Sequence, residues 1–230
     1  MTQQENRMAL FDAWAAQYDT AVAAGGDDFP FVGYDAVLDT VVAAAGARPS
    51  LRVLELGIGT GNLAERFDAA GCRVWGLDFS AAMLVRAQAR LPQVHLVRAD
   101  LMAAWPLAAR ALFDRIVAAY VLHEFDLPDK IRLLQRAARQ FLAPGGFLVI
   151  ADIAFPTTAV RAAAAERWAD WWDEDEFYWA ADEAVTACAA AGLRVDYRQG
   201  AGCAGGFTVE AAGTETAVRQ PTTGTTPGAV

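Results

Sequence analysis

Three glycines alternate with other residues directly after an apolar segment in the first third of the chain. Residues 53–63 read VLELGIGTGNL. Gly57 and Gly59 allow a sharp turn in which no Cβ atom stands between the backbone and a ligand. The helix expected to follow presents unpaired backbone N–H groups at its start. In an open α/β sheet, a turn of this kind after the first strand is where a cofactor binds.

A carboxylate ends the next apolar segment. Asp78 follows the glycines by about twenty residues, the separation at which an acidic residue meets ribose hydroxyls in nucleotide-binding folds. A carboxylate there accepts hydrogen bonds from both hydroxyls, so Asp78 predicts a nucleoside without separating NAD from other adenosine cofactors. Phe79 and Met83 come next and are expected either to flank the adenine or to pack inside the fold.

The spacing of the glycines favours one cofactor class. A dinucleotide-binding turn has the pattern G-x-G-x-x-G, but the glycines here fall as G-x-G-x-G, and Asn62 stands where the third would be. Glu55 precedes the first glycine by two positions. This pattern resembles the first motif of class I S-adenosylmethionine-dependent methyltransferases. An NAD-dependent oxidoreductase is the alternative, although no Tyr-x-x-x-Lys pair is recognisable, and a turn of purely structural value is the third interpretation.

The resemblance extends over residues 8–210. Residues 99–101, ADL, lie where an acidic side chain and a backbone N–H meet the adenine in that family. Residues 113–125, FDRIVAAYVLHEF, look like its fourth motif, and residues 142–148, LAPGGFL, like the turn before its fifth strand. Residues 11–19, FDAWAAQYD, resemble the lid helix of its small-molecule members, and the chain is most similar to the small, YrrT-like bacterial type.

This resemblance implies a cofactor, S-adenosyl-L-methionine, and a site for it. Tyr18 of the lid would reach the carboxylate of the methionine moiety, the glycines would support that moiety, and Asp100 with Leu101 would hold the adenine. The implied cofactor-binding residues are Tyr18, Glu55, Gly57, Gly59, Gly61, Asp78, Phe79, Met83, Asp100, Leu101 and Ala119.

Only two histidines are candidates for a general base. His123 follows the fourth predicted strand, at the edge of the sheet where ligands bind. It is expected to line the substrate site beside Tyr120 and is the candidate catalytic residue, with Glu124 placed to orient it. A base is not essential, because alignment of the reactants lowers the activation barrier by about 7–11 kcal/mol, whereas a base lowers it by roughly 3–5 kcal/mol. His95 lies within a predicted strand, and two histidines so far apart predict no metal site.

Four tryptophans lie within twelve residues near position 170. Residues 168–179 read WADWWDEDEFYW. At helical spacing, Trp168, Trp172 and Trp179 would pack a helix against the sheet; the other interpretation is an aromatic lid in which Trp171 and Tyr178 bind the substrate by stacking. The ring density suggests a small planar heteroaromatic substrate, pterin-like or azapteridine-like and methylated on nitrogen, with O- or C-methylation of another metabolite as the alternative. The acidic residues of this segment are expected on a solvated helix face.

Short apolar segments alternate with amphipathic helices between residues 51 and 151. Because most of these segments are continuously apolar, they predict parallel strands that are covered on both faces. The predicted strands are residues 51–56, 73–77, 94–98, 115–119 and 147–151, and the last of them follows a turn at residues 144–146. Residues 193–211 predict two more strands in a hairpin at the edge. The fold class is therefore α/β, with a Rossmann-like, doubly wound, mostly parallel seven-stranded sheet.

Helical lid elements are predicted outside this core. They are helices over residues 8–24 and 34–45 and an aromatic helix over residues 156–180. Residues 1–211 are interpreted as one methyltransferase domain, and residues 212–230, rich in Thr, Pro, Gly and Ala, as a disordered tail.

Composition limits the partners. A net charge of −9 and a pI of about 4.7 argue against nucleic acid and anionic membranes. Residues 118–121, AAYV, also lack the Asn/Asp-Pro-Pro-Tyr motif of DNA amino-methyltransferases. Three scattered cysteines predict free thiols in the cytoplasm. A small-molecule substrate is expected, while monomer and homodimer stay open. An alternative from another functional class is a module that binds the cofactor without catalysing a reaction.

Overall fold

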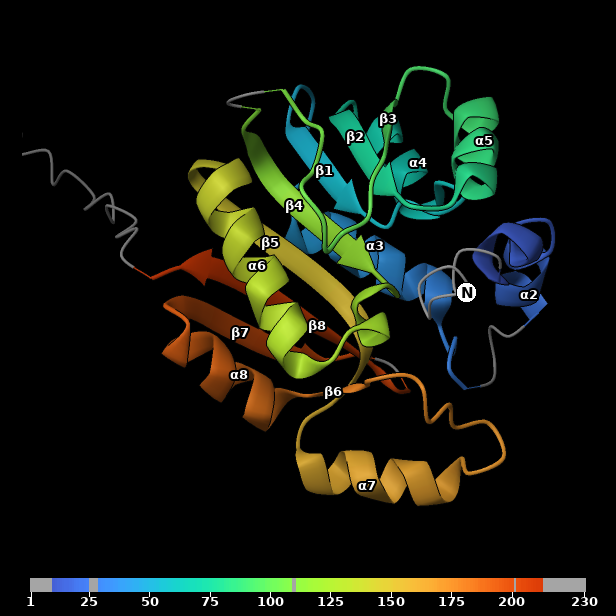
Figure 1. Cartoon of the computed structure of the whole chain (residues 1–230), viewed down its shortest axis with the longest axis vertical. Coiled ribbons are helices and arrows are strands. Elements are labelled where there is room, and N and C mark those ends of the chain that lie inside the picture. Colours follow the sequence, from blue (N-terminus) through green and yellow to red (C-terminus); the bar gives the residue numbers. More distant parts are fainter. Residues whose placement is uncertain (1–9, 25–28, 109–110, 201, 213–230) are drawn as a thin grey trace, which may run out of the picture.

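A twisted, mostly parallel sheet forms the centre of the computed structural model, which describes residues 10–24, 29–108, 111–200 and 202–212. Its strand order is β3-β2-β1-β4-β5-β8-β7 (Figure 1). The bounds are β1 Arg52–Leu56, β2 Arg73–Asp78, β3 His95–Arg98, β4 Phe113–Ala119, β5 Leu142–Phe155, β7 Leu193–Gln199 and β8 Ala204–Ala211. The first five strands are parallel, and β8 runs antiparallel to both β5 and β7. The predicted fold class is confirmed, and a two-residue strand, β6 (Trp179–Ala180), pairs with β5 in addition.

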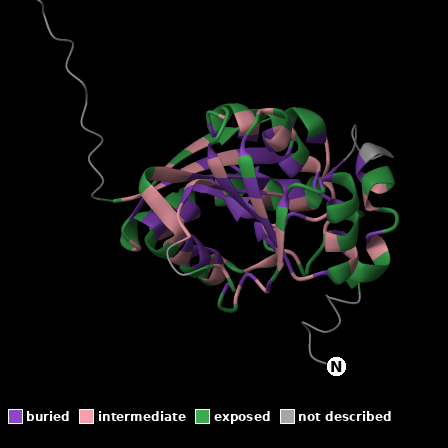
Figure 2. Cartoon of the chain, turned by 90° about the horizontal axis from the view of Figure 1, so that it is seen from above, coloured by how far each residue is buried: buried purple, intermediate pink, exposed green. Residues whose placement is uncertain are grey.

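Helices cover both faces of the sheet (Figure 1). Helices α3 (Tyr34–Ala44) and α4 (Asn62–Ala69) pack on one face, and α6 (Leu127–Phe141) and α8 (Ala181–Ala190) on the other. The described residues also form α2 (Tyr18–Ala24), α5 (Ala81–Arg90), α7 (Thr158–Arg167) and the short 3-10 helix η1 (Leu122–Glu124). The buried strands lie between these helices, whose outer faces are exposed (Figure 2). No helix in the described part of the chain has the length and apolar character needed to cross a membrane.

The strand β1 shows why a carboxylate can be buried at the sheet edge. Val53 belongs to the core on the α3–α4 side, whereas Leu54 and Leu56 belong to the core on the α6–α8 side. Successive side chains of a strand point to opposite faces, so Glu55 shares a face with Val53. The last residue of the strand is Leu56, and the glycine turn begins at the carboxyl edge of the sheet. Functional side chains are thereby placed at one edge of a rigid sheet.

The fifth strand is longer than predicted. The turn expected at residues 144–146 lies inside β5, because Phe113 pairs with Leu142 and Arg115 pairs with Phe147. One residue of β4 thus stands opposite four residues of β5, which form a bulge at the start of the strand. Gly145 has a φ of 76° within this bulge, a value that favours glycine.

The predicted N-terminal helix is broken in the described residues. Residues 10–14 are helical, residues 15–17 form a turn, and α2 begins at Tyr18. Each half has its own anchor: Asp12 accepts a hydrogen bond from Ser80 Oγ at 2.5 Å, and Asp19 accepts one from Thr60 Oγ1 at 2.6 Å. The turn lets the two halves dock separately, which helical periodicity alone does not reveal. Residues 8 and 9 lie outside the described residues.

The prediction of one aromatic helix over residues 156–180 is wrong beyond Arg167, where α7 ends. Turns and loop follow as far as β6. Trp168 and Trp172 leave the helical path because their rings stack on Phe29, with centroids 5.0 and 6.0 Å away. Contact with a distant part of the chain thus overrides the local helical spacing. Helix α8 was not predicted, and the expected tail over residues 212–230 lies outside the described residues except for Ala212.

Candidate functional site

The glycine turn after β1 has the geometry expected of a ligand-binding turn. Gly57, Gly59 and Gly61 have φ values of 69°, 54° and 94°, all in the left-handed region. Gly61 is the N-cap of α4. A Cβ atom added to Gly59 would meet nothing within 4 Å, so this side of the turn is open. The backbone can therefore approach a ligand closely at Gly59.

The carboxylate of Asp78 is fixed beside this turn. One of its oxygens accepts a hydrogen bond from Gly59 N at 2.9 Å, and the other accepts one from Ser80 N at 2.8 Å. Burial raises the pKa of Asp78, and the backbone hydrogen bonds oppose that rise only in part. Each oxygen keeps a second lone pair, which leaves acceptors at the end of β2 for a ligand's hydroxyl groups.

Glu55 is a buried carboxylate with an unfilled hydrogen-bonding capacity. Its side chain is 3% exposed, and Oε2 has no partner among the described residues. Burial, and then the nearby charge of Asp78, raise the pKa of Glu55 well above its usual range. A buried polar atom without a partner costs about 1–3 kcal/mol. Such an atom beside a glycine turn points to a polar ligand group as its partner.

The residues expected at the adenine gather at the ends of β2 and β3. Phe79 is half-buried and meets the ring of Phe11 edge-on, with centroids 5.4 Å apart. Asp100 Oδ1 accepts a hydrogen bond from Met102 N at 2.8 Å, and Leu101 is buried. Met83 is 2% exposed, which agrees with the packing interpretation of this residue. Its backbone N–H is capped by the hydroxyl of Ser80 at 3.1 Å.

Three tyrosines lie over the face of the sheet that carries Glu55. Tyr18 lies beside Tyr34, and burial raises the pKa of Tyr18. Tyr34 stacks on Tyr120, with ring centroids 5.1 Å apart and an angle of 26° between planes. Asp19, next to Tyr18, accepts the hydrogen bond from Thr60 in the glycine turn. Helix α2 is therefore docked on the turn by a carboxylate and on the tyrosine group by a phenol.

The segment after β4 connects the glycine turn with the aromatic segment. Ala119 is the last residue of β4, and Tyr120 follows it with a φ of 54°, an unusual conformation for a residue with a side chain. The Tyr120 hydroxyl is buried and has no partner among the described residues. Strained residues and unpaired buried polar atoms cluster at functional sites.

His123 is held by a carboxylate that the sequence prediction missed. Asp152 is fully buried on β5. Its Oδ1 lies 2.6 Å from His123 Nδ1, and its Oδ2 accepts a hydrogen bond from His123 N at 2.9 Å. Burial alone lowers the pKa of His123, but the adjacent Asp152 outweighs this and the net shift is upward. An Asp within the apolar run VIADIAF was the available signal. Only the register, which pairs Ala119 with Ala151, places the two side chains together.

Glu176 also turns toward His123. Phe177 N donates a hydrogen bond of 2.7 Å to the carbonyl of His123, which fixes the loop there. His123 Nε2 then lies 3.6 Å from Glu176 Oε1 and 3.7 Å from Glu124 Oε1. The expectation that the acidic run forms a solvated helix face is wrong for Glu176, because this segment is loop and its end is pinned to the residues after β4.

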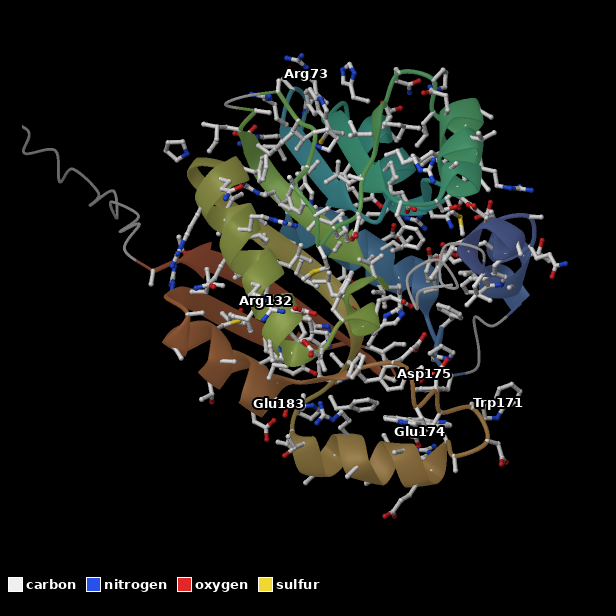
Figure 3. The ribbon with its side chains drawn as sticks, in the orientation of Figure 1. Arg73, Arg132, Trp171, Glu174, Asp175 and Glu183 are labelled. Carbon is white, nitrogen blue, oxygen red and sulfur yellow. The ribbon has the colours of Figure 1, made fainter. Side chains whose placement is uncertain are left out.

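The aromatic residues of this loop separate into two groups. Tyr178 is 4% exposed, with its ring 6.4 Å from that of His123 and 4.5 Å from that of Trp172. Trp171 is 72% exposed, and Figure 3 shows it at the outer rim of the loop, pointing away from the sheet. The structure thus brings Tyr178 to His123 and leaves Trp171 outside.

A cavity of about 270 Å³ lies behind the same loop. Its lining includes Lys130, Arg161, Glu176 and Tyr178. Lys130 is 2% exposed, donates a hydrogen bond to the carbonyl of Phe177, and has its pKa lowered to about 8 by burial. Both acidic and basic groups line the cavity, so its charge is mixed.

Comparisons with known proteins agree with this geometry. Residues 53–146 match the family described as methyltransferase domain. An uncharacterised methyltransferase of Geobacillus thermodenitrificans is 32% identical over 199 residues, covering 83% of this chain and 90% of that protein. A second, from Geobacillus kaustophilus, is 31% identical with the same coverage. The solved complex of DhpI with SAM and HEP is 20% identical, with a TM-score of 0.69 over 91% of this chain and 99% of DhpI. The DhpI–SAH complex is 19% identical, with a TM-score of 0.67 over 91% of this chain and 97% of DhpI.

Proposed function

Because the chain belongs to the class I S-adenosylmethionine-dependent methyltransferases, we propose that it methylates a small molecule bound beside residues 120–123. The bound cofactor supplies a methyl group that is already activated as a sulfonium. The work left to the protein is to hold the acceptor atom close and in line, which is worth about 7–11 kcal/mol of the barrier. The segment after β4 is the part of the chain that would do this.

The residues at the glycine turn fit the cofactor. Gly59 would let the backbone approach the methionine moiety, whose ammonium group suits the unpaired oxygen of Glu55. Asp78 would accept hydrogen bonds from the ribose hydroxyls, using the lone pairs that its two backbone hydrogen bonds do not occupy. Tyr18 would close over the methionine end, and Asp100 with Leu101 would meet the adenine, as expected from the sequence.

One observation supports the position of the substrate. Val121 packs against Gly57 so closely that a Cβ atom on the glycine would lie 2.1 Å from Val121 Cγ2. Two residues further, His123 lies beside Tyr178. The same short segment thus touches the cofactor turn at one end and the aromatic loop at the other. A molecule held by Tyr120, His123 and Tyr178 would lie next to the donor.

The aromatic character of this region supports a substrate class. We infer a small planar heteroaromatic molecule that is methylated on a ring nitrogen, because aromatic side chains from α3, from the segment after β4 and from the loop gather in this part of the fold. The stacked pair of Tyr34 and Tyr120 and the ring of Tyr178 support this. The Trp171 ring, which is exposed, adds nothing to it.

A panel of acceptors tests this proposal. The protein is incubated with S-adenosylmethionine and size-matched heteroaromatic N–H compounds, phenols or carbon acids, and S-adenosylhomocysteine release and product mass are measured. We expect turnover chiefly with the heteroaromatic N–H compounds. Turnover restricted to phenols or carbon acids would overturn the nitrogen assignment and leave methyl transfer intact. Absence of cofactor binding in calorimetry would overturn the cofactor site itself.

A further inference from the structure

We propose that His123 Nε2, Glu124 and Glu176 form a binding site for a divalent transition-metal ion such as Zn²⁺ or Mn²⁺. One ligand atom from each of these three side chains lies within 4.8 Å of the others. Glu124 follows His123 in the chain, but Glu176 comes from the loop before β6, so only the fold brings the set together. An imidazole and two carboxylates are ligands that both ions accept.

The distances fit a shared ion better than direct contacts. Nε2 lies 3.6 and 3.7 Å from the two carboxylate oxygens, beyond hydrogen-bonding distance. Two ligand atoms that are each about 2.1 Å from one ion are about 3.0–3.6 Å apart at angles between roughly 90° and 120°. The separation of 3.6 Å is at the upper end of that range, and the separation of 3.7 Å is just beyond it. Small movements of the glutamates would complete the geometry.

The imidazole gives an independent indication. The His123 side chain is nine-tenths buried, and its Nε2 has no hydrogen bond among the described residues. Its other ring nitrogen, Nδ1, is occupied by Asp152 at 2.6 Å. When Nδ1 carries the proton, the lone pair of Nε2 is directed toward two carboxylate oxygens, a donor set that a cation would complete. A carboxylate behind a histidine is also the usual support of a metal-binding imidazole.

Charge supports the same conclusion. Asp152, Glu124 and Glu176 place three carboxylates around one imidazole. The buried amine of Lys130 is a nearby cation, in the lining of the cavity that also contains Glu176. A divalent ion would offset this excess of carboxylates in a largely buried region. Tyr178, two residues further along the same loop, lines the same cavity as Glu176.

The role of the ion rests on the proposed function, whereas its binding does not. With three protein ligands, the ion keeps coordination positions open for an oxygen or nitrogen of the acceptor. It would anchor the acceptor beside Tyr178 and act as a Lewis acid toward it. In that case His123 contributes through the ion and does not serve as the general base expected from the sequence.

Metal binding to the full chain tests the site. The protein is dialysed against EDTA and then titrated with Zn²⁺ by calorimetry and with Mn²⁺ by electron paramagnetic resonance. We expect one ion per chain with a micromolar or lower Kd. Glu176→Gln should weaken binding at least about 100-fold, because loss of a supporting partner alone costs 10–100-fold. Asp152→Asn, which alters only the partner of His123, should weaken metal binding by about 10–100-fold.

The matched control is Glu174→Gln, which removes the same charge two residues away from an exposed side chain. It should leave the Kd within about twofold. A wild-type Kd above about 1 mM, or equal weakening in Glu174→Gln and Glu176→Gln, would overturn the site. Circular dichroism confirms that each variant is folded. Cofactor affinity of the metal-free protein, measured alongside, reports on Glu55 and Asp78 separately, so failure of the metal site and failure of the cofactor site are distinguishable.

Discussion

Val121 Cγ2 occupies the position that a side chain on Gly57 would need, 2.1 Å from where a Cβ atom would stand. The glycine therefore serves two purposes: its φ of 69° makes the turn, and its bare Cα lets the segment after β4 pack against that turn. The contact couples the residues proposed to hold the methyl donor to those proposed to hold the acceptor. Gly59 differs, because its Cα faces open space.

Gly57→Ala should therefore mainly reduce stability, whereas Gly59→Ala should mainly reduce cofactor affinity. Gly57→Ala combines left-handed strain of about 1–2 kcal/mol with overpacking, so denaturant unfolding should show a loss of at least about 2 kcal/mol. Gly59→Ala should lose only about 1 kcal/mol of stability but bind S-adenosylmethionine at least tenfold more weakly. Adding Val121→Ala should restore part of the stability of Gly57→Ala. No rescue would show that Val121 is not the obstacle.

Glu55→Gln should increase stability and weaken cofactor binding. The raised pKa of Glu55 means that its ionised form is disfavoured in the folded state, so stability is lost as the pH rises through that pKa. The variant should exceed the wild type at pH 8 by more than the roughly 0.5 kcal/mol typical of surface changes, and the gain should shrink as the pH falls. Glu166→Gln, an exposed change on α7, is the control. Equal stability at pH 8 would contradict the prediction.

Asp78→Ala should weaken S-adenosylmethionine binding by about 1–3 kcal/mol, because hydrogen bonds to buried hydroxyl groups are lost. Calorimetry gives the dissociation constant. Some stability is lost as well, since Gly59 N and Ser80 N lose their acceptor. Asp170→Ala, an exposed acidic position, should bind as the wild type does. An unchanged dissociation constant for Asp78→Ala would show that the ribose lies elsewhere.

Asp19→Ala should loosen α2 from the glycine turn. The carboxylate accepts the 2.6 Å hydrogen bond from Thr60 and a 3.2 Å bond from Asn62. We expect a loss of about 1 kcal/mol in stability and faster dissociation of the cofactor in stopped-flow measurements. Thr60→Ser keeps the hydroxyl and serves as the control. A dissociation rate that does not change would remove α2 from the role of lid.

Tyr178→Ala should reduce affinity for the acceptor, whereas Trp171→Ala should not. Tyr178 is buried beside His123, and Trp171 is at the outer rim of the loop. An aromatic contact is worth about 0.5–1.5 kcal/mol, so KM should rise about two- to tenfold in the first variant. Both variants are compared in steady-state kinetics with the best acceptor. A larger effect from Trp171→Ala would place the acceptor on the outer face of the loop.

Features set by local conformation could be predicted from the sequence. The glycine turn is one, because the alternating glycines supply three positive φ values directly after an apolar strand. Asp78 is another, because the last residue of a buried parallel strand has to lie at the carboxyl edge of the sheet. The doubly wound, mostly parallel sheet also follows from the alternation of strands and helices, whereas the strand order comes from the structure.

Contacts between distant segments were decided only by the tertiary structure. The break in the N-terminal helix, the loop after Arg167 and the burial of Met83 depend on packing partners that lie far away in the sequence. The joining of His123, Asp152 and Glu176 depends on the register between β4 and β5 and on one backbone hydrogen bond from Phe177. Periodicity and propensity report on neighbours within a few residues of the chain. A buried carboxylate or imidazole, by contrast, takes its chemical character from whatever charges the fold places beside it.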